Sequence, residues 1–234
     1  MSVHFFHGDK GGVGKSFVAA SFVDWLIARR RLSPLVVDCD MRNPDLARMF
    51  SGSTTTHNVD LRQHEGWLEL LSLLDESAHR EVVISLPAGV GAEVADELPA
   101  FIADATDLRR EVTLLWVLSR TPDSINLLRP AMTAFAGQAR AMVVLKNLFF
   151  GDAGRFGRWN ESKTRTAFEE ANGIVVEFPD LLDRLVDQTA MAHPPVPFCT
   201  KLEGLRFGDR SELSRWLAKI DALWTSLSGP LGVS

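Results

Sequence analysis

A short stretch of glycines and lysines near the amino terminus has the residue types that bind phosphate. Residues 8–16 read Gly-Asp-Lys-Gly-Gly-Val-Gly-Lys-Ser, directly after an apolar run and directly before a helical pattern. Glycines let main-chain amides converge on phosphate oxygens, and the helix that follows adds its positive dipole end. Lys15 is expected to reach the β- and γ-phosphates, and the Ser16 hydroxyl to coordinate Mg²⁺. We predict a phosphate-binding loop here; the alternative is a glycine-rich turn without a ligand.

Two carboxylates follow a second apolar run, in the sequence Asp38-Cys39-Asp40. Alternate residues of a strand share a face, so Asp38 and Asp40 are expected to point the same way from the carboxyl edge of a sheet. There they can orient an attacking water and lie near Mg²⁺. We therefore predict that both carboxylates lie at a metal and water site, with Asp38 in contact with the metal. The alternative is that the pair caps the next helical turn.

The elements that must position these residues alternate along the chain. Short runs of Val, Ile, Leu and Phe without polar alternation predict strands at 3–7, 35–38, 81–86, 112–118, 141–146 and 174–177. Helical patterns lie between them at 15–31, 66–77, 92–106, 123–137, 161–171 and 181–189. This order predicts an α/β fold, a doubly wound and mainly parallel sheet with helices on both faces. Residues 1–234 are expected to form one domain, with a carboxyl-terminal docking helix near 209–227.

Composition narrows the class of protein. The 234 residues are 46% hydrophobic and 24% charged, which excludes a mostly disordered chain. The 25 basic and 30 acidic residues give a net charge of −5, so the overall charge does not indicate nucleic-acid binding. Two cysteines, no signal-peptide pattern and no apolar stretch long enough to span a bilayer predict a cytoplasmic protein without stable membrane insertion.

The glycine-lysine loop resembles that of a known family. Asp9 occupies the first glycine position of the standard phosphate-loop pattern, whereas Lys-Gly-Gly-x-Gly-Lys-Ser resembles the deviant Walker A motif of the ParA/MinD ATPases. The resemblance implies a P-loop NTPase fold and an ATP-bound homodimer. It also implies catalytic roles for Lys15 and for Lys10, which would touch the nucleotide of the other subunit. Phe17 departs from the family, in which a hydroxyl there often contacts the α-phosphate. The nucleotide-binding residues predicted from this loop are Gly11, Gly12, Val13, Gly14, Lys15, Ser16 and Phe17.

Asp38-Cys39-Asp40 also resembles the Asp-x-Asp segment of this family, which implies that Asp38 activates the attacking water, with Asp40 as its helper.

A further family segment is altered. Residues 85–89, Ser-Leu-Pro-Ala-Gly, resemble the Asp-x-Pro-Ala-Gly switch, with Ser85 in place of the aspartate that usually holds Mg²⁺ through water. Gly89 remains and is expected to offer its amide to the γ-phosphate. Loss of such an outer-shell group typically lowers metal affinity by about 10–100-fold. The sequence therefore predicts nucleotide binding with slow hydrolysis, or with none.

The base of the nucleotide is assigned by the same resemblance. Asn147 follows an apolar run at the position where relatives use an asparagine to read adenine, although taken alone an asparagine after a strand is more often a turn residue. Pro179 and Asp180 match a turn whose backbone lies against the base. A guanine-recognition signature is missing, so ATP is favoured over GTP.

Two further surfaces have a functional and a structural interpretation. Arg155, Arg158, Lys163 and Arg165, with Phe156 and Trp159 among them, can grip a nucleic-acid backbone, or can simply be a solvated loop and helix face. The apolar side of the carboxyl-terminal helix predicts docking onto the core, because its polar side mixes acidic and basic residues where a membrane-binding helix would be basic.

Taken with the resemblance, these features predict an ATP-dependent dimer switch in plasmid partition, conjugation or mobilisation, or in the positioning of another cargo. Its partners are expected to be a second copy of the chain and DNA or a DNA-bound adaptor protein. A nucleotide-dependent adaptor without significant hydrolysis is the alternative that Ser85 motivates. A phosphotransferase related to bacterial tyrosine kinases is disfavoured, because those enzymes modify their own tyrosines and this chain has none.

Overall fold

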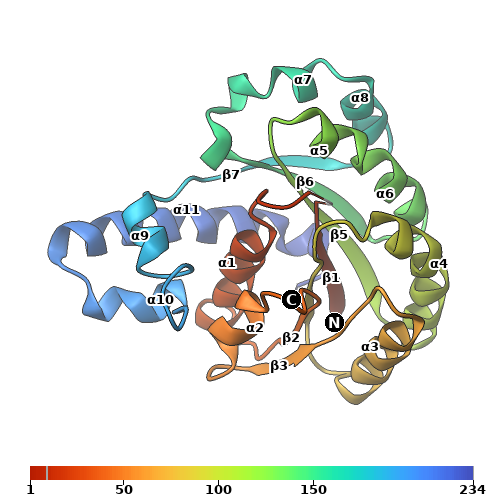
Figure 1. The fold of residues 1–234 in the computed structure, drawn as a ribbon, viewed down its shortest axis with the longest axis horizontal. Coiled ribbons are helices and arrows are strands. Elements are labelled where there is room, and N and C mark those ends of the chain that lie inside the picture. The colour runs from red at the N-terminus through yellow and green to blue at the C-terminus, as the bar shows by residue number, and fades with distance from the viewer. Residues whose placement is uncertain (9, 234) are drawn as a thin grey trace.

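A seven-stranded parallel sheet forms the centre of the molecule in the computed structural model, which describes residues 1–8 and 10–233 (Figure 1). Its strand order is β3-β2-β4-β1-β5-β6-β7, and each neighbouring pair is parallel. The strands are β1 (Ser2–His7), β2 (Leu35–Asp38), β3 (Thr55–Asn58), β4 (Val82–Ser85), β5 (Glu111–Leu118), β6 (Ala141–Asn147) and β7 (Ile174–Phe178). The doubly wound α/β fold predicted from the sequence is confirmed.

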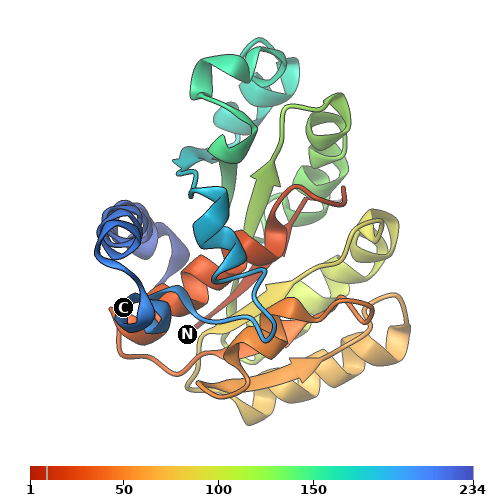
Figure 2. The same cartoon turned by 60° about the vertical axis from the view of Figure 1, so that its left-hand side comes forward.

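Helices cover both faces of this sheet. They are α1 (Lys15–Ala28), α2 (Asp45–Phe50), α3 (His64–Glu76), α4 (Gly91–Asp107), α5 (Pro122–Asn126), α6 (Leu128–Phe135), α7 (Gly157–Asn160), α8 (Lys163–Glu170), α9 (Asp183–Asp187), α10 (Phe198–Lys201) and α11 (Phe207–Leu231). Short 3-10 turns are η1 (Leu148–Phe150), η2 (Ala153–Arg155) and η3 (Leu202–Gly204). Helices α3, α4 and α6 lie on one face, and α1, α2 and α11 on the other (Figures 1 and 2).

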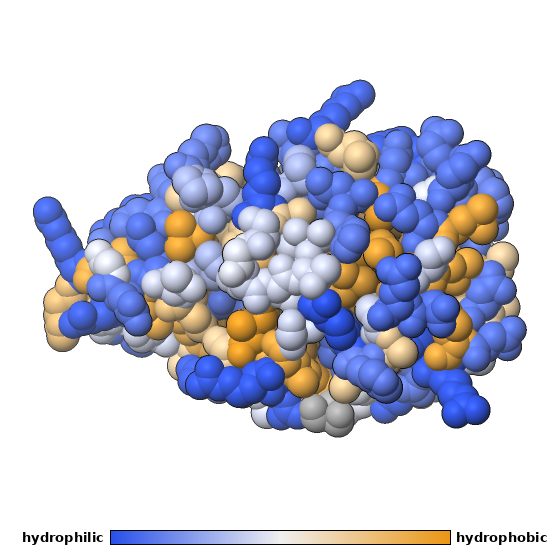
Figure 3. All heavy atoms as spheres, turned by 90° about the horizontal axis from the view of Figure 1, so that it is seen from below, coloured by the Kyte–Doolittle hydropathy of each residue, from blue (hydrophilic) through white to orange (hydrophobic). Residues whose placement is uncertain are grey.

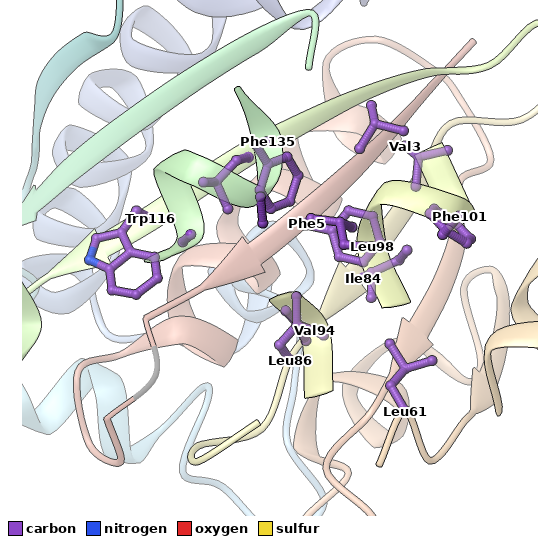
Figure 4. Close-up of a cluster of buried hydrophobic side chains, with 14 of the residues drawn as sticks. Val3, Phe5, Leu61, Ile84, Leu86, Val94, Leu98, Phe101, Trp116 and Phe135 are labelled. Carbon is purple, nitrogen blue, oxygen red and sulfur yellow. The ribbon is translucent and has the colours of Figure 1, made fainter. Parts of the chain in front are cut away.

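The alternation of side chains along β1 creates two cores. Val3 and Phe5 point to the face of α3, α4 and α6, where Figure 4 shows them among Ile84, Phe101 and other apolar side chains. Phe6 points to the opposite face, against α1 and α11. Because helices cover both faces, the inner strands consist mainly of apolar residues. Each large apolar side chain that is fully buried stabilises the fold by roughly 1.5–3 kcal/mol.

The predictions fail at one edge of the sheet. The sequence predicted neither a strand nor a helix in residues 51–63, but they contain the edge strand β3, which pairs with β2. Its sequence, Thr-Thr-His-Asn, is polar because an edge strand is only partly covered. The short helix α2 was also missed, since six residues carry little periodic signal. The single helix expected at 123–137 is divided into α5 and α6.

The long helix α11 lies against α1, with its apolar side buried. Two tryptophans join the helices through polar contacts: the Nε1 of Trp224 donates to Ser21, and that of Trp25 donates to Asp221. Among the residues that the structure describes, no helix has the length and apolar character to cross a membrane. On the face in Figure 3, hydrophilic residues predominate and apolar atoms form small groups among them.

Candidate functional site

The predicted phosphate loop follows β1 and leads into α1 at the carboxyl edge of the sheet, where open α/β sheets bind ligands. Lys15 is the first residue of α1, and only 8% of it is exposed. Its Nζ donates hydrogen bonds to the carbonyls of Gly8 (3.1 Å) and Lys10 (3.0 Å), so the loop curls around the ammonium group. Val13 is buried and anchors the loop to the core. Asp9 lies outside the described residues.

Asn147 braces this loop from the end of β6. Its Nδ2 donates to the carbonyl of Val13 at 2.9 Å, and its Oδ1 accepts the amide of Phe149 at 3.2 Å. The contact requires glycine at position 14: φ is +93°, and a Cβ there would lie 2.6 Å from Nδ2 of Asn147. The amide that was expected to read adenine therefore also holds the phosphate loop, and it keeps one donor and one acceptor position for a ligand.

A pocket of about 300 Å³ opens beside this brace. Six residues predicted from the sequence line it together: Gly12, Gly14, Phe17, Asn147, Pro179 and Asp180. Sequence reasoning missed five others, which are Phe149, Leu181, Asp183, Val186 and Met191. Apolar residues in a turn or a short helix give no pattern that separates a pocket wall from a core contact. Phe149 and Met191 are 58% and 65% exposed, so they cover the core only in part.

Phe17 supports the pocket through α11. Its ring packs at 5.2–6.1 Å from the rings of Phe178, Phe198 and Trp216. The Nε1 of Trp216 also donates to the carbonyl of Pro179 at 3.0 Å, which fixes the turn at the pocket wall. In this chain the residue in place of the family's hydroxyl is thus an aromatic anchor between α1 and the carboxyl-terminal helix.

Asp38 caps the start of α2 in this structure. Only 1% of the residue is exposed, and its carboxylate accepts the main-chain amides of Leu46 (3.0 Å), Ala47 (3.2 Å) and Asp40 (3.1 Å). Burial raises the pKa of Asp38 to about 6, although the three amides act in the opposite direction. This is the capping geometry that the sequence left open; the roles in water activation and metal binding stay predictions.

Asp40 lies beyond the end of β2 and is partly exposed. Its Oδ1 accepts the amides of Arg42 and Asn43, each at 3.1 Å, so it holds the turn before α2. Because the strand ends at Asp38, the two carboxylates do not share a strand face as the sequence reasoning assumed.

The altered switch segment lies next to Asp38. Ser85 ends β4, is 2% exposed, and is paired in register with Asp38 of β2. Gly89 follows in an exposed turn before α4, with φ of +70°. Ala88 reaches the phosphate loop, since a Cβ on Gly11 would lie 3.9 Å from its own. The segment therefore lies next to the predicted phosphate loop.

Lys10 is not among the residues that line the pocket beside Asn147. Its Nζ donates to the Oδ2 of Asp123 at 2.6 Å, and the two side chains are 42% and 58% exposed. Asp123 lies in the first turn of α5. An exposed pair of this kind is weak, so Lys10 can leave it at little cost.

His7 is a buried polar residue beside the loop that sequence reasoning did not use. It is 2% exposed, its ring lies 4.7 Å from that of Trp116, and its Nδ1 has no hydrogen-bond partner among the described residues. Burial, together with the nearby Lys15, lowers the pKa of His7 to about 3. The residue before the phosphate loop is thus a neutral imidazole.

The aromatic part of the predicted nucleic-acid patch is wrong. Phe156 and Trp159 are each 1% exposed and belong to the core, so neither can stack on a base. Their short elements need apolar anchors, and a basic-aromatic pattern in the sequence does not distinguish an anchor from a stacking platform. Arg165 pairs with Glu169 on the same helix. The exposed cations of the patch are Arg155, Arg158 and Lys163.

The fold and the phosphate loop define a P-loop protein with the fold of the ParA/MinD ATPases. A ParA family ATPase from Chlorobium tepidum TLS has a TM-score of 0.53 at 13% identity, covering 93% of this chain and 98% of its own. A chain of the MinC:MinD cell division complex from Aquifex aeolicus has a TM-score of 0.51 at 12% identity, covering 94% and 96%. Such identities establish the fold alone.

A curated relative gives the family. The chain is 35% identical over 215 residues to Protein MobD from Acidithiobacillus ferrooxidans, which covers 92% of each sequence. No family model matches the chain. The chain belongs to the MobD family.

Proposed function

We propose that this chain is an ATP-binding, slowly hydrolysing dimer switch that acts in plasmid mobilisation, conjugation or partition, or in positioning another cargo. One observation carries the proposal: a single pocket joins the phosphate loop to Asn147 and to the turn at Pro179 and Asp180. These segments are far apart in the sequence, and each was assigned to nucleotide binding before the fold brought them together. Membership of the MobD family and the fold shared with a ParA family ATPase support the class.

The triphosphate is proposed to lie in the loop of residues 8–16. The main-chain amides of the loop and the start of α1 would bind its oxygens, and Lys15 would exchange the carbonyls of Gly8 and Lys10 for phosphate. Ser16, in the first turn of α1, fits a magnesium-bound triphosphate. Main-chain amides occupy three of the roughly four acceptor positions on the Asp38 carboxylate, so one position on Oδ1 would remain for a metal.

Hydrolysis is the weaker half of the proposal. Ser85 takes the place from which relatives hold the metal through water, and a serine hydroxyl is neutral. Mg²⁺ would therefore depend on Ser16, water and the phosphates themselves. An adaptor that binds ATP without significant turnover is the second candidate, and Ser85 at the end of β4 is the observation that favours it.

ATP binding and turnover separate these candidates. We expect calorimetry to detect ATP binding in the presence of Mg²⁺, and Lys15→Ala to abolish it. Lys219→Ala is the matched control, because this exposed lysine lies on α11 outside the pocket. If the wild-type protein hydrolyses ATP at steady state and Lys15→Ala does not, the adaptor without turnover is ruled out. Failure of the wild-type protein to bind ATP would overturn both candidates.

DNA, or a protein bound to DNA, is the partner that we propose for the ATP-bound form. The three exposed cations of the segment at 155–163 support it, since they can neutralise phosphates. We expect salt-sensitive DNA binding that requires ATP and that weakens when Arg155, Arg158 and Lys163 are all replaced by alanine. DNA binding that ignores this triple change would rule out the patch as the contact.

A further inference from the structure

Phe149 is the most exposed ring next to the candidate nucleotide pocket. It is 58% exposed, and it lines the same pocket as Gly12 and Gly14 of the phosphate loop. Because more than half of Phe149 is exposed, packing against the core does not explain an aromatic side chain at this position. Large apolar surface at a pocket is typical of a contact with a ligand.

The ring is held in place from the backbone. Phe149 lies in the 3-10 turn η1, and its amide donates to Oδ1 of Asn147 at 3.2 Å. The side chain of Asn147 also donates, through Nδ2, to the carbonyl of Val13 at 2.9 Å. The side-chain amide of Asn147 therefore links the phosphate loop to the turn η1, which carries the ring of Phe149. The neighbouring ring of Phe150 packs edge-on against it at 5.2 Å.

Other apolar side chains of the pocket come from a different part of the fold. Leu181, Val186 and Met191 lie before, within and after α9, which the two ribbon views place beside α1 (Figures 1 and 2). The pocket thus has apolar walls next to a loop of main-chain amides. This combination fits a molecule with a flat apolar ring at one end and phosphates at the other.

We propose that Phe149 is the positioning residue for the nucleobase, which packs on its ring while the phosphates occupy the loop of residues 8–16. The inference rests on the proposed function, because it assumes that the pocket takes a nucleoside triphosphate. Stacking acts on the face of the base and does not depend on its edge. Asn147 contributes by holding η1 against the phosphate loop, whether or not it also bonds the base.

Comparison of ATP with inorganic tripolyphosphate tests the role of the ring, because only ATP carries a base. Calorimetry with Mg²⁺ gives the two affinities for each variant. Phe149→Ala should weaken ATP binding by about 5- to 150-fold, the range for loss of one base-aromatic stack. Its affinity for tripolyphosphate should stay within about twofold of wild type, and Phe149→Trp should restore ATP binding.

The matched control is Phe207→Ala, since Phe207 is 79% exposed on α11 and is not part of the pocket. Neither affinity should change in this variant. Because both phenylalanines are exposed, both alanine variants should keep the thermal unfolding temperature of the wild type.

The outcomes separate this inference from the proposed function. If ATP binds and Phe149→Ala leaves its affinity unchanged, or weakens tripolyphosphate as much as ATP, the ring does not position the base and the inference falls alone. It also falls alone if wild type binds tripolyphosphate as tightly as ATP. If wild type binds neither compound, the proposed function fails and takes the inference with it.

Discussion

Lys10 and Asp123 form an ion pair of 2.6 Å between the phosphate loop and the first turn of α5. Both side chains are more than two-fifths exposed, so water screens the pair and its contribution to stability is at most about 1 kcal/mol. The family resemblance implies that Lys10 touches the nucleotide of a second subunit. In this structure it instead makes a weak contact within its own subunit, which it can exchange for another.

The proposed dimerisation can be tested through these two residues. ATP with Mg²⁺ is expected to double the apparent mass of the wild-type protein in sedimentation, and Lys10→Ala should prevent the change. Asp123→Asn should dimerise like wild type or at lower protein concentration, because it removes only the partner within the subunit. If Asp123→Asn blocks dimerisation as Lys10→Ala does, the ion pair itself is required and the contact with a second subunit is not supported.

The brace between Gly14 and Asn147 can be tested with two glycines of similar conformation. Gly14 and Gly12 have φ of +93° and +75°, but only a Cβ on Gly14 would meet another atom, Nδ2 of Asn147 at 2.6 Å. Gly14→Ala should lower the free energy of unfolding by about 1–2 kcal/mol more than Gly12→Ala, the size of one lost buried hydrogen bond. Urea denaturation of the ligand-free proteins measures this.

A double variant supplies the control for the brace. In an Asn147→Ala background, Nδ2 of Asn147 no longer blocks a Cβ at position 14. Gly14→Ala should then lower the free energy of unfolding by no more than Gly12→Ala does. An unchanged excess cost would show that backbone strain, and not the contact with Asn147, explains the effect.

Asp38 should make stability depend on pH. Burial raises its pKa from 3.8 to about 6, so between these values the folded protein holds a proton that the unfolded chain releases. The carboxyl therefore contributes most below pH 4, and its contribution falls by roughly 3 kcal/mol as the pH rises past 6. The difference in unfolding free energy between wild type and Asp38→Asn should decrease over this window. A difference that increases would mean that the amides of α2 outweigh burial.

Ser85 should limit how much magnesium increases the affinity for ATP. Ser85→Asp places a carboxylate at the end of β4, and we expect the ratio of ATP affinities with Mg²⁺ and with a chelator to rise by about 10–100-fold. Ser85→Asn has a similar shape without the charge and should leave the ratio as in wild type. The aspartate variant should also unfold at a lower temperature, because the new charge is buried beside Asp38. An unchanged ratio in Ser85→Asp would argue against a metal-side role for this position.

The sequence by itself determined the parts that depend on neighbouring residues. The phosphate loop is one contiguous segment, and its glycines and lysine are recognisable without knowledge of the fold. The inner strands were predicted because burial on both faces makes most of their residues apolar. The edge strand β3 and the short α2 were not, because partial cover leaves β3 polar and six residues leave α2 without a period.

Only the tertiary structure decided how distant residues share their contacts. Asn147 was predicted from its place in the family pattern, but its bond to Val13 joins residues 134 positions apart, and no local pattern encodes it. The capping of α2 by Asp38 and the exposure of Phe149 likewise depend on which surfaces the folded chain covers. Residue type gives a side chain its chemistry, whereas burial and the nearest donor decide which part of that chemistry is available.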